Sequence, residues 1–255
     1  KGKKIRPILV LLSAKLCGEI TPRSYTAATL VEMLHTATLI HDDVVDDAKT
    51  RRGLASINAV WKNKIAVLMG DFMLSRGLLL ALENDECGFL KITSRAVKRM
   101  SEGELLQIQK NRKFDVNEET YFRIISDKTA SLINACCELG AASTSKDKNE
   151  VKLMGEFGEN LGIAFQLRDD LLDYIGKKKI MGKSSGSDLK EKKFTLPLIH
   201  SLNNASKKEA KDIVSLVKNG SYSKSRSIVM DFIKEHNGIE YTIDKTTEYC
   251  ATAKN

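Results

Sequence analysis

Two short clusters of aspartates are the residues in this sequence most able to do chemistry. Their members are Asp42, Asp43, Asp46 and Asp47 in the first cluster, and Asp169, Asp170 and Asp173 in the second. Aspartates four positions apart share one face of a helix, where like charges repel each other. Such a group would be tolerated only if cations neutralised it. Carboxylate oxygens suit Mg²⁺, and no Cys or His spacing indicates zinc.

Basic residues near the first cluster suit a phosphate ligand. Arg51 and Arg52 follow Asp46 closely, and the guanidinium fork can bind phosphate oxygens in a bidentate manner. A polar loop would explain the pair equally well without the neighbouring carboxylates. His35 precedes Asp42 by seven positions, which places both on roughly one helix face. A lone histidine there is more often a core residue, and His41 is interpreted as structural.

Composition limits the possible function classes. The 255 residues carry a formal net charge of +8, with 42% hydrophobic and 29% charged residues, which is ordinary for a globular protein. No basic cluster is interleaved with aromatics, so we expect no nucleic-acid partner. The five cysteines form no CxxC pair, which favours free thiols and a cytoplasmic location. No apolar run indicates a transmembrane segment.

The periodicity predicts an all-α protein. Few prolines and glycines interrupt the chain, and no strand-like alternation is convincing. Helices are expected over residues 6–17, 22–45, 57–82, 91–112, 118–139, 148–174, 195–203 and 206–217, with a tail that is helical in parts. Thr21 and Pro22 are typical of a helix start. Residues 176–193 are rich in glycine, serine and lysine and are interpreted as a mobile loop.

In this setting the aspartate clusters resemble the two metal-binding motifs of trans-polyprenyl diphosphate synthases. The first is Asp42-Asp43-Val-Val-Asp46 followed by Arg51-Arg52-Gly53, and the second is Asp169-Asp170-Leu-Leu-Asp173. Further matches follow in the family's order: residues 2–7, His35-Thr36, Gly70-Asp71, residues 127–130, Phe165-Gln166, Gly182-Lys183 and residues 195–197. Each piece is weak alone, but the ordered set is specific.

The resemblance implies a fold and a site. It implies one isoprenoid synthase-type domain over residues 1–255, a helical bundle around a central cavity, with both terminal segments missing and a homodimer as the usual assembly. It implies magnesium bound by Asp42, Asp46 and Asp169, supported by Asp43 and Asp173. The allylic diphosphate would be held by Arg51, Lys128, Thr129, Gln166 and Lys183, with Lys193 as a weaker candidate. Isopentenyl diphosphate would be held by Lys3, Arg6, His35 and Arg52.

The implied reaction is a prenyl transfer. Magnesium and cationic side chains would stabilise the diphosphate that leaves as the allylic carbocation forms. Isopentenyl diphosphate would wait beside that cation, and closure of the loop at residues 176–193 would exclude water. The strongest catalytic candidates are Asp42, Asp46, Asp169, Lys128 and Arg51.

Small residues before the first motif predict a long product. In the family, an aromatic residue four or five positions before the first aspartate often stops elongation, and here Thr38 and Ala37 occupy those positions. We therefore expect a hexaprenyl to octaprenyl or longer product, closest to octaprenyl-type synthases. A geranylgeranyl or farnesyl diphosphate synthase is the alternative.

Three other classes compete with this interpretation. A terpene cyclase shares the fold and the first motif, but the second aspartate motif and the isopentenyl diphosphate residues argue against it. A non-catalytic partner subunit would have degraded motifs, and these are intact. A metal phosphohydrolase, suggested by His35 and His41, would leave the second cluster unexplained.

Overall fold

The computed structural model describes the backbone of residues 3–51, 53–113, 117–175, 187–191, 193–219 and 222–255. The side chains of residues 112–113, 187–188 and 222–224 lie outside the description. The chain divides into two compact units, Lys1–Val97 with Ile133–Gly158, and Lys98–Leu132 with Glu159–Asn255. That residues 1–255 form a single domain stays a prediction.

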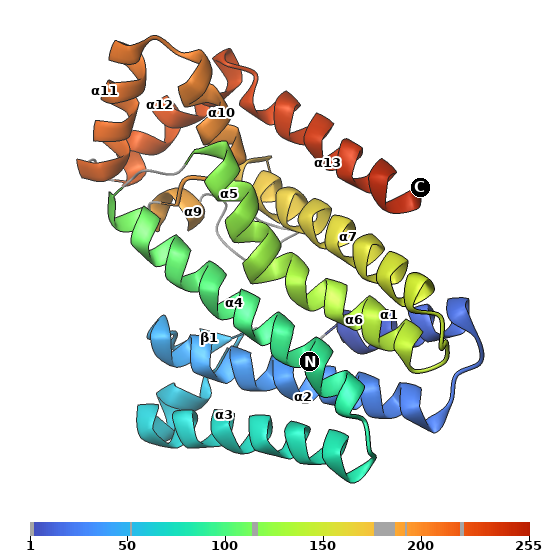
Figure 1. Ribbon diagram of the computed structural model, residues 1–255. Coiled ribbons are helices and arrows are strands. Elements are labelled where there is room, and N and C mark those ends of the chain that lie inside the picture. Colours follow the sequence, from blue (N-terminus) through green and yellow to red (C-terminus); the bar gives the residue numbers. More distant parts are fainter. Residues whose placement is uncertain (1–2, 52, 114–116, 176–186, 192, 220–221) are drawn as a thin grey trace. The chain divides into compact units, whose positions relative to one another are not determined.

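Helices account for nearly all of the described elements, which confirms the predicted all-α class (Figure 1). Unit 1 contains α1 (Ile5–Cys17), α2 (Pro22–Val45), the strands β1 (Thr50–Arg51) and β2 (Leu54–Ala55), and α3 (Ile57–Glu83). Three helices contribute residues to both units: α4 (Cys87–Lys113), α6 (Ser131–Ala142) and α7 (Lys148–Ile175). Unit 2 contains α5 (Glu118–Ile125), the π-helix η1 (Ser126–Ala130), α9 (Ser187–Lys190), α10 (Leu196–Asn204), α11 (Lys207–Asn219), α12 (Tyr222–Glu235) and α13 (Gly238–Lys254).

The helix α2 carries the first aspartate cluster at its C-terminal end. It begins as the sequence predicted, with Pro22 in the first turn, where a missing N–H costs nothing, and with the Thr21 N–H donating to the Ser24 hydroxyl at 3.2 Å. It ends at Val45, and Asp47 adopts a left-handed conformation with φ 46°. The short antiparallel pair β1–β2 follows, with Gly53 at φ 79° between the strands.

The helix α3 lies along α2 and presents two different faces (Figure 1). Its buried face is made of small residues, Ala66, Gly70, Gly77 and Ala81, which let the two backbones approach. The exposed apolar face of α3 extends across a kink at Lys62, with Trp61 64% accessible before the kink and Phe72 57% accessible after it. An 18-residue stretch of α3 has a mean hydropathy of 1.8, so by length and composition alone this helix could cross a membrane. The apolar runs of the sequence had indicated no transmembrane segment.

Unit 2 has its own hydrophobic core. Residues from several helices meet in it, including Leu167, Leu196, Leu198, Ile199, Val229 and Ile233. The tail is more helical than predicted, because it forms α12 and α13. Most of the segment predicted as a loop lies outside the described residues, but Ser187–Lys190 forms a helical turn in which Leu189 is buried.

The predicted helix over residues 118–139 is interrupted by the π-helix η1. The Ser131 N–H donates to the Ser126 carbonyl, five residues back rather than four. Such π-helical turns insert one residue into a helix and are frequent at functional sites. This one contains Lys128 and Thr129, two of the predicted diphosphate ligands.

Candidate active site

The first aspartate cluster occupies the last turn of α2 and the residues directly after it. Asp42 and Asp46 are exposed, and Asp43 is only 5% accessible. The Asp46 N–H closes the last helical turn on the Asp42 carbonyl at 2.8 Å. The exposed pair therefore follows the four-residue spacing expected of one helix face.

The second cluster has the same position in its own helix. Asp169 and Asp173 lie in the last two turns of α7, which ends at Ile175. Asp169 is exposed and Asp173 is 7% accessible. The C-terminal end of a helix carries partial negative charge, so a carboxylate there costs about 0.3–1 kcal/mol at low ionic strength. Asp46 at the end of α2 and Asp173 in the last turn of α7 thus stand where helices disfavour anions, and a bound cation would offset that cost.

These carboxylates fit a hard divalent cation. Exposed aspartate oxygens are the donors that Mg²⁺ and Ca²⁺ prefer. Among the described residues, a group of two carboxylates and a histidine, Glu209, Glu235 and His236, lies on α11 and at the C-terminal end of α12 with its ligand atoms within 4.8 Å of one another. Its two glutamates are exposed, and neither aspartate cluster contributes to it.

Arg51 and Asp43 form an ion pair within unit 1. The Arg51 Nε donates to Asp43 Oδ1 at 2.7 Å, and the arginine side chain is 35% accessible. The Asp43 backbone is held as well, because its carbonyl accepts from Asn58 Nδ2 at 3.0 Å. The Asp43 side chain therefore pairs with Arg51, the arginine that the family resemblance assigned to diphosphate binding.

Arg6 and His35, both assigned to isopentenyl diphosphate, are brought together. Arg6 lies on α1 and His35 on α2, and Arg6 Nη1 lies 2.9 Å from His35 Nε2. If the arginine is the donor, the imidazole is neutral and carries its proton on Nδ1. Lys3 is exposed ahead of α1. Arg52, the fourth predicted residue, lies outside the described residues.

His41 packs between α2 and α3, in agreement with its structural interpretation. Its Nε2 lies 3.3 Å from the Val67 carbonyl and 3.3 Å from Asp71 Oδ1. A Cβ at Gly70 would overlap the His41 ring, so any larger residue there would require the ring to move. The matched Gly70-Asp71 pair therefore positions the histidine that precedes Asp42.

In unit 2, Thr129 and Gln166 join the second cluster through hydrogen bonds. Thr129 Oγ1 donates to Gln166 Oε1 at 2.9 Å, and Gln166 Nε2 donates to Asp170 Oδ1 at 2.6 Å. The Tyr121 hydroxyl donates to Asp170 Oδ2 at 2.6 Å. Asp170 is 6% accessible and thus serves to orient its neighbours.

Lys128 points to α4, where a carboxylate and an amide hold its ammonium. It forms an ion pair with Glu104 and donates to Gln107 Oε1 at 2.9 Å. Lys193, the weaker candidate, pairs with Glu191. Lys183 lies outside the described residues.

The two chain-length positions lie on α2. Ala37 is 2% accessible, and the Thr38 hydroxyl donates to the His35 carbonyl at 2.9 Å. Both side chains are small at the positions where an aromatic residue often stops elongation in the family.

Sequence reasoning missed the residues that hold the predicted ligands in place. They are Glu104 and Gln107 on α4, and Tyr121 on α5. The spacing of Glu104 and Gln107, three apart on one helix, was available as a signal. Tyr121 contacts Asp170, which is distant in sequence, and gave no signal.

Comparison with known proteins identifies the family. The family model described as Polyprenyl synthetase matches residues 1–234. The chain belongs to the polyprenyl synthetase family. It is 36% identical to the octaprenyl diphosphate synthase of Escherichia coli (strain K12) over 97% of this chain and 76% of that protein. It is 35% identical to the geranylgeranyl diphosphate synthase of Saccharolobus solfataricus, over 97% of this chain and 77% of that one.

A solved structure of the family gives the same fold. The polyprenyl synthase of Caulobacter crescentus, described in complex with calcium and isoprenyl diphosphate, has a TM-score of 0.90 and 34% identity, over 100% of this chain and 78% of that one. This polyprenyl synthetase is therefore a prenyltransferase with the all-α isoprenoid synthase fold, as the motifs predicted.

Proposed function

We propose that this polyprenyl synthetase condenses isopentenyl diphosphate with allylic diphosphates and repeats the reaction to build a long polyprenyl diphosphate. The supporting observation is that both aspartate motifs are complete and both end a long helix. A structural role would not favour carboxylates at two helix C-termini.

Magnesium is the proposed metal, and Asp42, Asp46 and Asp169 are its proposed ligands, supported by Asp43 and Asp173. When bound, the metal supplies Lewis-acid stabilisation of the departing diphosphate. The exposed carboxylates fit this role, and the calcium in the Caulobacter structure's description is consistent with a divalent cation.

Arg51, Lys128, Thr129, Gln166 and Lys183 are proposed to hold the allylic diphosphate. Arg51 and Lys128 each pair with a carboxylate of the chain, Asp43 and Glu104 respectively. A diphosphate would replace these carboxylates as the partner of each cation. Release of Asp43 from Arg51 would then free a carboxylate beside Asp42 and Asp46, so binding of metal and of diphosphate should favour each other.

Lys3, Arg6, His35 and Arg52 are proposed to hold isopentenyl diphosphate. The contact between Arg6 and His35 supports this assignment, because it fixes the guanidinium before a ligand arrives. A pre-positioned donor loses less conformational entropy on binding.

The proposed product is hexaprenyl to octaprenyl or longer. The small residues Ala37 and Thr38 and the identity to an octaprenyl synthase support a long product. The similar identity to a geranylgeranyl synthase keeps that shorter product as the alternative. Products no longer than geranylgeranyl diphosphate would contradict the long-chain proposal.

The proposed assembly is a homodimer in the cytoplasm. A second copy would cover the exposed apolar face of α3, which includes Trp61 and Phe72. The free cysteines of the chain suit the reducing conditions of that compartment.

The test is an incorporation assay. The protein is incubated with labelled isopentenyl diphosphate, farnesyl diphosphate and Mg²⁺, and the dephosphorylated products are sized. We expect long products that disappear with chelator. Asp42→Ala and Asp169→Ala should each lower the rate about 100-fold or more, because each removes metal-assisted charge stabilisation.

Asp212→Ala is the matched control, since Asp212 is an exposed helical aspartate on α11 that belongs to neither motif. It should leave the rate unchanged. A folded wild-type protein that incorporates no label with any allylic diphosphate would refute the proposed function.

A further inference from the structure

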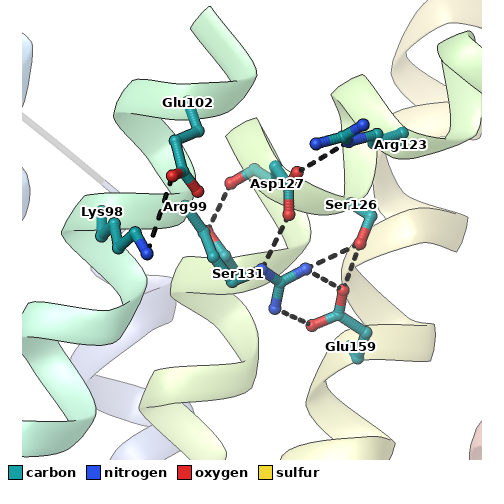
Figure 2. A network of polar contacts seen from close by, with 8 residues as sticks. All are labelled: Lys98, Arg99, Glu102, Arg123, Ser126, Asp127, Ser131 and Glu159. Carbon is teal, nitrogen blue, oxygen red and sulfur yellow. Dashed lines mark hydrogen bonds and ion pairs between the residues drawn. The ribbon is translucent and has the colours of Figure 1, made fainter.

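An arginine outside the family motifs connects three helices of unit 2. Figure 2 shows Arg99 of α4 between Ser126 and Asp127, which open the π-helix η1, and Glu159 of α7. The arginine side chain is 28% accessible, Asp127 17% and Glu159 21%. The charges are thus mostly shielded from water, where such contacts are stronger than on an open surface.

Four of the five N–H groups of the guanidinium donate to these partners. Its Nε donates to Asp127 Oδ1 at 2.8 Å, and Nη1 and Nη2 donate to the two Glu159 oxygens at 2.9 and 2.7 Å. Nη2 also donates to the Ser126 hydroxyl at 2.7 Å, and that hydroxyl donates to Glu159 (Figure 2). The hydrogen bonds that Arg99 donates to Glu159 and Asp127 raise the pKa of the arginine further above its ordinary value, against the effect of burial. Only a planar fork can make this set of bonds, so lysine is a poor substitute.

Two glycines bring the flanking helices against the π-helix. A Cβ at Gly103, one turn after Arg99 on α4, would lie 2.9 Å from Lys128 N and 2.9 Å from Asp127 Cβ. A Cβ at Gly162 on α7 would lie 2.5 Å from Ala130 Cα. The backbone of η1 is therefore in close contact with α4 at one end and α7 at the other.

Lys128 and Thr129 directly follow the residues that Arg99 holds. Lys128 points to α4, where it meets Glu104 and Gln107, and Thr129 points to Gln166 on α7. A π-helical turn is less regular than an α-helical one and needs local support. A shift of η1 would displace both side chains together.

We infer that Arg99, through Asp127 and Glu159, is a positioning residue that fixes the π-helix so that Lys128 and Thr129 can bind the allylic diphosphate. The inference rests on the proposed function for the identity of that ligand. It adds residues that do not touch the substrate but determine whether two of its ligands are in place.

The test separates the two substrates. The Michaelis constants for farnesyl diphosphate and for isopentenyl diphosphate are measured for wild type, Arg99→Lys and Glu159→Gln. Both variants should raise the Michaelis constant for farnesyl diphosphate about 10- to 100-fold, because loss of an orienting partner misplaces the groups it supports. The constant for isopentenyl diphosphate should change less than about twofold.

Arg95→Lys provides the control. Arg95 lies one turn before Arg99 on the same helix and donates from Nη2 to both carboxylate oxygens of Glu138, but its side chain is 59% accessible and its partner lies on α6. This variant should behave as wild type. Equal effects on both substrates, or on Arg95→Lys and Arg99→Lys alike, would overturn the inference and leave Arg99 a merely structural residue.

A milder variant tests the same role with less risk of misfolding the protein. Ser126→Ala removes only a hydroxyl from the network and should raise the farnesyl diphosphate constant in the same direction by a smaller factor, with an unchanged circular dichroism spectrum. An unchanged constant in folded Ser126→Ala and Arg99→Lys would refute the positioning role. Absence of incorporation by wild type would instead refute the proposed function.

Discussion

At the scale of single residues, the site is held in a neutralised state by the chain itself. Arg51 pairs with Asp43, and Lys128 pairs with Glu104. Each pair combines a predicted substrate ligand with a carboxylate, so the charges compensate one another before any ligand binds. In the proposed binding mode, the diphosphate replaces the carboxylate as the partner of each cation, so neither cation has to be without a partner beforehand.

The cysteines differ sharply in their environments, and this predicts their reactivity. Burial raises the pKa of Cys136 and raises that of Cys137 to about 11, whereas Cys87 is exposed. Only the thiolate reacts with disulfide reagents. At pH 8, Cys87 should therefore react with dithionitrobenzoate well before Cys136 and Cys137, which should react only on unfolding.

Mass spectrometry of the labelled protein would identify the order of modification. Cys87→Ser should abolish the fastest phase and leave the slow ones. Rapid labelling of Cys136 or Cys137 in the folded protein would show that their region of unit 1 opens readily.

At the scale of elements, the packing of α1 decides where Arg6 lies. A Cβ at Gly140 of α6 would stand 2.2 Å from the Val10 carbonyl on α1, and backbone cannot move away as a side chain tip can. Gly140→Ala should therefore lower the free energy of unfolding by about 1–3 kcal/mol, the usual cost of overpacking. If α1 shifts, the Michaelis constant for isopentenyl diphosphate should rise as well.

Gly77→Ala is the matched control on α3. Its Cβ would lie 3.4 Å from Leu30 Cδ1, which is ordinary contact, and alanine favours a helix by up to about 1 kcal/mol over glycine. Urea denaturation should show Gly77→Ala as neutral or stabilised. A Gly140→Ala protein as stable as Gly77→Ala would mean that α1 is not packed this closely.

The sequence predicted most helices within a few residues, because apolar periodicity and capping signals are local. The start of α2 at Thr21-Pro22 and the cap of α5 are examples, since Asn117 Oδ1 accepts from the Thr120 N–H. The π-helix at Ser126–Ala130 was not predictable, because its support comes from Arg99 and Glu159, which are distant in sequence. The aspartate motifs were recognisable from order and spacing, whereas the partners that orient them were not.

At the scale of the whole molecule, the exposed apolar face of α3 is a candidate binding surface for a partner. Its residues Val60, Trp61, Ile65, Leu68 and Phe72 are each more than 40% accessible. Contiguous apolar surfaces of this kind mark protein or membrane contacts. We proposed a second copy of the chain as the occupant.

Phe72→Glu should weaken that assembly, because it places a charge in the centre of an apolar contact. Light scattering coupled to gel filtration should give twice the chain mass for wild type and a smaller value at equal concentration for the variant. Leu153→Glu, at an exposed position on α7, is the control and should not change the mass. A monomeric wild type that floats with phospholipid vesicles would instead assign this face to a membrane.

The position of both aspartate motifs at helix C-termini has a consequence for engineering. Replacing Asp46 by asparagine removes a charge that the end of α2 disfavours, and should make the metal-free protein more heat-resistant. A library screened for thermostability without metal would therefore enrich variants with these carboxylates lost. Screens of this enzyme for robustness need magnesium and a diphosphate present, so that the selected state is the one that performs the reaction.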